Sequence, residues 1–196
     1  MASIYENYFK LLMKWNERMN LMSVKTFDEF LGKHIEDSKV LLPYISDSKS
    51  LIDLGSGAGV PAIPVKIERP DLKMTMIEAT RKKVSFCEEA IRQLGLNDIV
   101  VVWGRAEDES LARSVGVADV VISRATWDLK TYIQVAERYI ANDGKCIAMK
   151  GSKWNQELED AGNALDKTGL SLERVHEYTL AASEKRCIVI LAKISE

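Results

Sequence analysis

The sequence predicts an α/β fold, with a mostly parallel seven-stranded sheet and an N-terminal helical cap. From residue 51 onward, short apolar runs alternate with segments of helical periodicity, which is typical of a doubly wound sheet. A glycine-rich turn follows the first apolar run, at the edge where such sheets bind their ligands. Residues 1–45 show only helical patterns. We therefore expect a single domain over 1–196, divided into a cap (1–45) and a Rossmann-like core (46–196).

The first part of the cap has the pattern of one amphipathic helix over residues 3–22. Ser3 and Glu6 form a capping box at its start. Trp15 belongs to an apolar stripe at helical spacing, and such a stripe more often packs on a core than binds a partner. We expect Trp15 in the core, with partner binding as the alternative.

The rest of the cap begins at Thr26 with a second capping pattern and continues helical over 34–42 until Pro43. His34 lies in this segment. A lone histidine is usually a hydrogen-bonded structural residue, and the chain has only two histidines, without the spacing of metal ligands. We therefore expect no bound metal.

The core is predicted as five strands separated by helices, followed by an antiparallel pair of strands. Apolar runs predict strands over 51–54, 74–78, 99–103, 119–123, 144–149, 172–179 and 187–193. Helical periodicity predicts helices over 60–68, 81–94, 129–140 and 156–167.

The glycine-rich turn is the main basis of the site prediction. Gly55, Gly57 and Gly59 let the backbone turn sharply and approach a ligand closely. A dinucleotide-binding loop needs its third glycine one residue later, at Val60. The spacing found, with Asp53 in the preceding strand, resembles motif I of the class I S-adenosylmethionine (SAM) methyltransferases. The alternative is an ordinary turn without a ligand, which would seldom need three glycines because each disfavours the helix that follows.

Polar side chains follow several other strands, and the carboxyl ends of parallel strands share one edge of a sheet. Glu78 ends the second strand roughly twenty residues after Gly55, where a βαβ unit places its ribose-binding acid. A solvated surface glutamate is the alternative. The residues expected at this edge are Asp53 to Gly59, Glu78, Arg105 to Glu107, Arg124 and Lys150.

The net charge of −2 gives no global basic excess, so a nucleic-acid partner would need basic residues focused on one face. Arg81, Lys82 and Lys83 open a predicted helix, where the helix dipole disfavours cations. This arrangement indicates a bound anion or, as readily, a solvated run of charge. Further basic residues expected near the same edge are Arg105, Lys150, Lys153, Lys185 and Arg186.

Composition indicates a cytoplasmic protein. Three widely spaced cysteines among apolar neighbours form neither a zinc pattern nor a disulfide framework, which fits a reducing compartment. Glu6, Lys10 and Lys14 interrupt the N-terminal apolar pattern, so it lacks the apolar core of a signal peptide. Because no run approaches transmembrane length, we expect no membrane partner.

Several blocks together resemble one family, the bacterial RsmG (GidB) 16S ribosomal RNA guanine-N7 methyltransferases. The resemblance spans nearly the whole chain, and its most specific part is the glycine turn with the following Pro61 and Pro64. The other similar blocks are Trp15 to Leu21, His34 to Ser38, Gly104 to Glu107, Ser123 to Ala125, Met149 to Gly151 and Arg186. The chain differs from the family pattern at Val60 and Ala62, where Phe and Gly are usual.

The resemblance implies SAM as the cofactor, 16S ribosomal RNA or the small subunit as the partner, and methylation of a guanine N7 in the 530 loop. Carried over to this chain, the family's SAM contacts fall on Gly55, Val60, Ala106, Glu107 and Arg124. With the glycine turn and the ribose acid, the cofactor-binding prediction covers Asp53, Gly55, Ser56, Gly57, Gly59, Val60, Glu78, Ala106, Glu107 and Arg124. We expect a monomer.

N7 of guanine carries a free lone pair and no proton, so we assign no general base. Alignment of the reacting atoms is required instead. The candidates for positioning the substrate are Arg105, Arg124, Lys150 and Arg186, and those for binding RNA are Lys82, Lys83, Lys153 and Arg186. Two alternatives stay open: a SAM methyltransferase acting on a small molecule or a protein, and a non-catalytic SAM-binding module.

Overall fold

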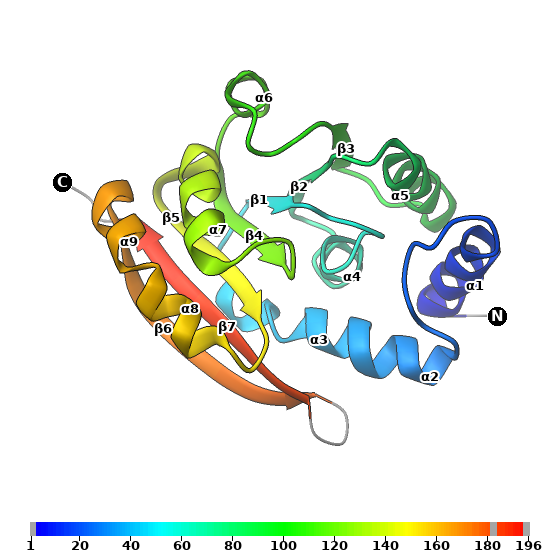
Figure 1. The fold of residues 1–196 in the computed structure, drawn as a ribbon. Helices are drawn as coiled ribbons and strands as arrows, with labels where there is room; N and C mark the ends of the chain where they lie inside the picture. The colour runs from blue at the N-terminus through cyan, green and yellow to red at the C-terminus, as the bar shows by residue number, and fades with distance from the viewer. Residues whose placement is uncertain (1–2, 181–183, 194–196) are drawn as a thin grey trace.

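A seven-stranded sheet forms the centre of the fold, in the order β3-β2-β1-β4-β5-β7-β6 (Figure 1). The computed structural model describes residues 3–180 and 184–193. β1 to β5 pair in parallel, whereas β7 runs antiparallel to both β5 and β6. The predicted fold class and the antiparallel final pair are confirmed, and the sheet is therefore mixed. The strands are β1 Ser50–Leu54, β2 Lys73–Glu78, β3 Ile99–Trp103, β4 Ala118–Arg124, β5 Ile140–Lys150, β6 Leu170–Leu180 and β7 Glu184–Lys193.

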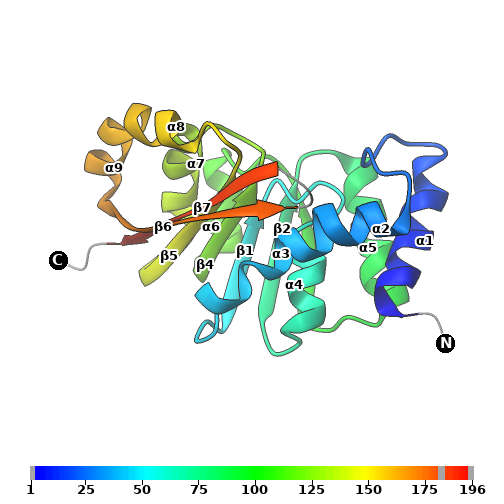
Figure 2. The same ribbon diagram turned by 90° about the horizontal axis from the view of Figure 1, so that it is seen from below.

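Helices cover both faces of the sheet, as the two views show (Figures 1 and 2). One face carries α1 Ile4–Asn16, α2 Phe27–Phe30, α3 Glu36–Lys39, α4 Ala62–Glu68 and α5 Arg81–Leu94. The other carries α6 Glu109–Val115, α7 Leu129–Ala136, α8 Trp154–Asp160 and α9 Gly162–Thr168. Short helical turns lie at Leu31–Ile35 (π) and at Leu42–Tyr44 and Glu137–Tyr139 (both 3-10).

β1 explains why the predicted strands are continuous apolar runs. Leu51 packs into the hydrophobic cluster under the cap, α4 and α5, whereas Ile52 and Leu54 pack into the cluster under α7. A parallel strand covered on both faces has no solvated side, so it does not alternate polar and apolar residues. Asp53 is the exception within this strand, and it is 1% exposed.

The cap packs against α4 and α5 on one side of the sheet. The ring of Tyr8 is fully buried and lies edge to face on Phe30, with 5.3 Å between ring centroids. It also stacks on Phe86 of α5 at 6.3 Å. Trp15 contacts the same Phe86 ring at 5.6 Å but is only partly buried, so it lies at the margin of the core.

α1 ends at Asn16 and not at residue 22 as predicted. The Asn16 side chain accepts hydrogen bonds from the backbone N–H groups of Leu21 (2.8 Å) and Met22 (3.2 Å). It also donates one to the Met22 carbonyl (2.6 Å). Because an asparagine side chain can replace the backbone partners of a helix in this way, the chain turns back into a loop.

Other element boundaries also differ from the sequence prediction. Residues 34–42 form a π turn, α3 and a 3-10 turn in place of one helix, and the helix predicted over 129–140 ends at Ala136. The helix predicted over 156–167 is divided into α8 and α9 next to Gly162, a residue of low helix propensity. The short helix α6 was not predicted.

Candidate functional site

A cavity of about 600 Å³ lies between the cap and the loops that follow β1, β2, β3 and β4. It occupies the sheet edge at which the sequence places the site. The predicted site residues that line it are Gly55, Ser56, Gly57, Val60, Glu78, Lys83, Arg105, Ala106, Glu107, Arg124 and Arg186. Residues from six separate segments of the chain therefore meet in one place.

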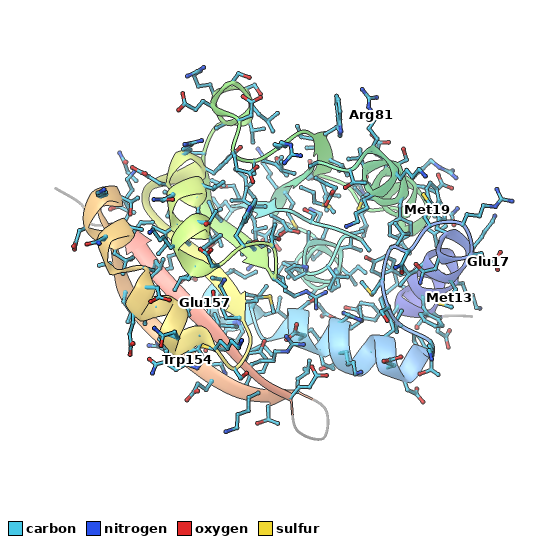
Figure 3. All side chains as sticks on the ribbon, in the orientation of Figure 1. Met13, Glu17, Met19, Arg81, Trp154 and Glu157 are labelled. Carbon is cyan, nitrogen blue, oxygen red and sulfur yellow. The ribbon has the colours of Figure 1, made fainter. Side chains whose placement is uncertain are left out.

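The other predicted site residues do not line this cavity. Asp53 is buried in β1 and Gly59 is buried within the glycine turn, whereas Lys82 and Lys153 are exposed. Lys150 is buried: its ammonium group pairs with Glu157 of α8 at 2.7 Å and donates to the Trp127 carbonyl at 2.6 Å. Figure 3 labels Glu157 on α8. Lys150 thus holds the loop after β4 against α8.

The cavity also has lining residues that were not assigned to the site from the sequence. Leu21, His34, Gly104 and Ala125 lie in blocks that carry the family resemblance, which was the available signal. Met22, Ile77, Ala79, Thr126 and Trp127 gave no such signal. The Asn16 hydrogen bonds place Leu21 and Met22 in the wall, and Trp127 closes it by donating from Nε1 to Glu107 at 3.0 Å.

Four backbone N–H groups of the glycine turn already have hydrogen-bond partners, most of them in β2. Those of Gly55 and Ser56 both donate to the Ile77 carbonyl, at 2.9 and 3.1 Å, and that of Gly59 donates to Ser56 at 2.8 Å. The N–H of Gly57 donates to Glu78 Oε2 at 2.8 Å. These four groups are therefore not free to cradle a phosphate.

Gly55 and Gly57 need glycine for different reasons. Both have positive φ, +74° and +59°. A Cβ on Gly55 would lie 2.6 Å from Thr126, whereas a Cβ on Gly57 would meet only the Gly55 carbonyl at 4.0 Å. Gly55 therefore permits close packing of the loop after β4, and Gly57 leaves space open in the cavity.

Glu78 and Asp53 are buried carboxyl groups beside the turn. Glu78 is 6% exposed and accepts from the N–H groups of Gly57 and Thr80, both at 2.8 Å. Asp53 Oδ2 has no hydrogen-bond partner among the described residues. Burial raises the Asp53 pKa to about 7, and the nearby Glu78 charge adds to this effect, while Ser56 and Arg124 oppose it.

Arg124, at the end of β4, belongs to a chain of polar contacts with the cap. Its Nη1 lies 3.1 Å from Asp37 Oδ2, and its Nη2 lies 3.2 Å from His34 Nδ1. Asp37 is 1% exposed and accepts a second hydrogen bond from the Tyr178 hydroxyl of β6 at 2.6 Å. The Arg124 guanidinium is thus held from two sides by groups distant in sequence.

Arg186 connects the cavity to a second hollow of about 460 Å³. This hollow is lined by Gly151, Ser152, Glu184, Lys185 and Arg186. Arg186 Nη2 pairs with Glu184 at 2.8 Å, while its Nε is buried without a hydrogen-bond partner in the part of the chain that the structure describes. Arg81, at the start of α5, lies over the Trp103 ring at 3.8 Å and is labelled in Figure 3.

Within residues 3–180 and 184–193, no group of three or more His, Cys, Asp or Glu side chains could hold a metal ion. In the same ranges, no helix is long and apolar enough to cross a bilayer.

Comparison with known proteins gives consistent matches. The family described as rRNA small subunit methyltransferase G matches residues 1–188. The Ribosomal RNA small subunit methyltransferase G of Thermoanaerobacter sp. (strain X514) is 34% identical over 196 residues, which covers 97% of this chain and 81% of that protein. The protein of the same name from Geotalea uraniireducens (strain Rf4) is 36% identical over 194 residues, covering 98% and 88%.

Solved structures share the fold at much lower identity. Geranyl diphosphate C-methyltransferase from Streptomyces coelicolor A3(2) superimposes with a TM-score of 0.66 at 11% identity, covering 98% of this chain and 99% of that one. Identity at this level shows a common fold alone.

Proposed function

Because the chain belongs to the rRNA small subunit methyltransferase G family, we propose that it methylates N7 of a guanine in small-subunit ribosomal RNA, with SAM as the cofactor. The observation that carries the proposal is a single cavity joining the glycine turn to Arg124 and Arg186. The half of the cavity beside the turn suits the cofactor, and the half beside Arg124 suits a base.

The residues of the first half fit SAM. The open space at Gly57 admits a ligand close to the backbone, and four N–H groups of the turn already have hydrogen-bond partners, which agrees with a cofactor that carries no phosphate. Glu78 lines the same wall and keeps lone pairs for ribose hydroxyls. We assign Ala106, Glu107 and Val60 to the remaining wall of the cofactor site.

The second half supplies positioning rather than proton transfer. When bound, SAM supplies an electrophilic methyl group. Guanine N7 presents a lone pair without a proton, so none of the chain's side chains has to act as a base. Arg124 is fixed by Asp37 and His34, and Arg186 faces the same space, so both can hold a base or a phosphate in line for transfer.

The cations around the cavity provide the RNA contacts in this proposal. Lys83, Arg105 and Arg186 line the cavity. Lys185 is exposed and lines the second hollow, and Lys82 and Lys153 are exposed next in sequence to Lys83 and Ser152; we call these three exposed lysines the rim cations. Because Lys150 is buried against Glu157, we do not assign it to the substrate. Phosphate contacts from these residues would make RNA binding fall with salt.

We further propose that residues 1–196 act as one domain and as a monomer in the cytoplasm, with no metal. The cap and the sheet share one hydrophobic cluster, which supports a single unit. A ribosomal RNA substrate supports a location in the cytoplasm. The family resemblance supports a guanine in the 530 loop.

The test is methyl transfer from radiolabelled SAM to 16S ribosomal RNA, offered free and within the small subunit. The expected result is one labelled guanine, at which reduction and aniline treatment cleave the RNA because N7 is methylated. Label at another atom, or only in a protein or small molecule, would overturn the proposal. SAM binding without transfer to any of these would indicate a non-catalytic module.

A further inference from the structure

His34 reaches the cavity from the cap with one of its two ring nitrogens occupied. The His34 Nδ1 lies 3.2 Å from Arg124 Nη2. A guanidinium group has only donors, so Nδ1 must accept this hydrogen bond and cannot carry a proton. In a neutral imidazole the proton then lies on Nε2, which makes Nε2–H a donor.

The surroundings keep this imidazole neutral. The His34 pKa is lowered to about 4, mainly by burial and then by the Arg124 charge, which together outweigh the opposing charges of Asp37 and Glu29. Arg124 itself is held at Nη1 by the buried Asp37, which Tyr178 also contacts. The tautomer of His34 is therefore fixed by a chain of contacts that runs from the cap through β4 to β6.

His34 enters the cavity from a part of the chain that supplies none of the proposed cofactor residues. Apart from Arg124, those residues come from the segments at the ends of β1, β2 and β3, whereas His34 lies in the cap and contacts Arg124 at the end of β4. Among the hydrogen bonds of the described residues, none engages His34 Nε2. A base that enters beside Arg124 would therefore meet an uncommitted N–H donor.

The edge of guanine that contains N7 also contains O6, and both atoms are acceptors. Adenine presents N7 beside an amino group, which is a donor. A fixed N–H donor beside N7 therefore accepts guanine and rejects adenine. A neutral donor also suits a base that becomes cationic on methylation, because it adds no like charge.

We propose that His34 Nε2–H donates a hydrogen bond to O6 of the target guanine, and that Arg124, supported by Asp37, is the positioning residue that fixes this donor. The assignment rests on the proposed guanine-N7 activity. It makes His34 the residue that selects guanine at the methylated position.

The test is a double-mutant cycle in which one change is made in the protein and the other in the target base of the RNA. The 16S ribosomal RNA is ligated with 2-aminopurine ribonucleotide, which keeps N7 but lacks O6, at the mapped position. For the wild-type protein we expect kcat/KM to fall roughly 10- to 100-fold with the analogue, because a buried donor loses its partner. For His34→Ala the two substrates should differ by no more than about threefold, since the donor is already absent.

Three controls separate base recognition from a structural role. Inosine, which keeps O6 but lacks the 2-amino group, should show no coupling to His34. His176→Ala, which removes the other histidine, should keep the wild-type preference for O6. His34→Phe fills similar space without an N–H, and His34→Gln restores a donor, so a folded variant remains if His34→Ala is unstable.

Equal losses on guanine and 2-aminopurine in a folded His34→Ala or His34→Phe protein would overturn the assignment. The preference for O6 would then come from elsewhere in the site. This outcome differs from failure of the proposed function, in which the wild-type protein would not methylate guanine at all.

Discussion

Tyr8 of α1 donates its hydroxyl hydrogen bond to the backbone carbonyl of Ala58, at 2.5 Å, within the glycine turn. The Tyr8 side chain is fully buried. The contact joins the first helix of the cap to the loop that we assign to the cofactor, although 50 residues separate the two in sequence. The cap therefore supports the floor of the site as well as covering the sheet.

Tyr8→Phe should weaken both stability and cofactor binding. It leaves the Ala58 carbonyl without its partner in a buried position, which costs about 1–3 kcal/mol. We expect a loss of this size in urea unfolding and a severalfold loss of SAM affinity in calorimetry. Tyr5→Phe is the matched control, because the Tyr5 hydroxyl bonds to Glu68 away from the turn. Equal effects of the two variants on SAM affinity would contradict the coupling.

Gly57→Val should abolish SAM binding without abolishing the fold. The side chain would enter the open space at Gly57, where its Cβ meets no protein atom closer than 4.0 Å. The positive φ of 59° adds a backbone cost of about 1–3 kcal/mol. Gly95→Val is the matched control, since Gly95 has φ +66° and open space but caps α5 outside the cavity. We expect a similar stability loss in both and a loss of SAM affinity in Gly57→Val alone, measured by calorimetry.

Trp15→Ala should destabilise the protein moderately and leave the site intact. Full burial would make the cost about 3–5 kcal/mol, but Trp15 is partly buried and contacts Phe86 with one edge, so we expect about 2 kcal/mol. Urea unfolding measures this cost, and SAM binding by the folded variant should be unchanged. A variant with wild-type stability and defective RNA binding would make Trp15 a binding residue.

The sequence predicted those parts of the fold that depend on local pattern. The apolar runs located the strands because parallel strands are buried on both faces, and three alternating glycines located the turn at Gly57. Because ligands bind at the carboxyl ends of parallel strands, Glu78 and Arg124 were expected at one edge of the sheet, and both line the same cavity.

Side-chain partners across the fold could not be read from pattern. Lys150 ends β5, where a substrate contact would be expected, yet it pairs with Glu157 of a helix whose orientation only tertiary packing sets. Asp37 lies in the cap and meets Arg124 across 87 positions of sequence. The early end of α1 depends on one side chain, Asn16, which binds a loop whose conformation the helical period does not encode.

Charge reversal at three exposed cations of the rim should reduce RNA binding and spare the cofactor. We choose Lys82, Lys153 and Lys185 because none of them lines the main cavity. Each phosphate contact contributes about 0.7 to the log–log salt slope for single-stranded RNA, so the triple Glu variant should lower the slope by about 2. Filter binding across a salt series measures the slope, and calorimetry checks that SAM affinity is unchanged.

The control for this experiment reverses three exposed cations at the opposite edge of the sheet. Lys49 immediately precedes β1, Lys73 is the first residue of β2, and Lys167 lies in the last turn of α9. Their replacement by Glu changes the net charge by the same amount. If this variant lost RNA binding as strongly as the rim variant, net charge and not a basic rim would govern the affinity.

Asp53 should make the free energy of unfolding fall as pH rises. Its pKa is about 7 in the folded protein and 3.8 as the ordinary value, so between these limits the native state holds a proton that the unfolded state has lost. The stabilisation is complete below pH 3.8 and is lost as pH rises through 7.

Asp53→Asn cannot ionise and resembles the protonated acid, so it should gain about 2–3 kcal/mol relative to the wild type between pH 5 and pH 8. Urea unfolding without SAM at both pH values measures this change. His34, whose pKa is lowered to about 4, contributes an opposite slope in both proteins, and the comparison cancels it. A stability difference that stays constant from pH 5 to pH 8 would show that Asp53 is ionised throughout, and its unpartnered Oδ2 would then be a buried charge.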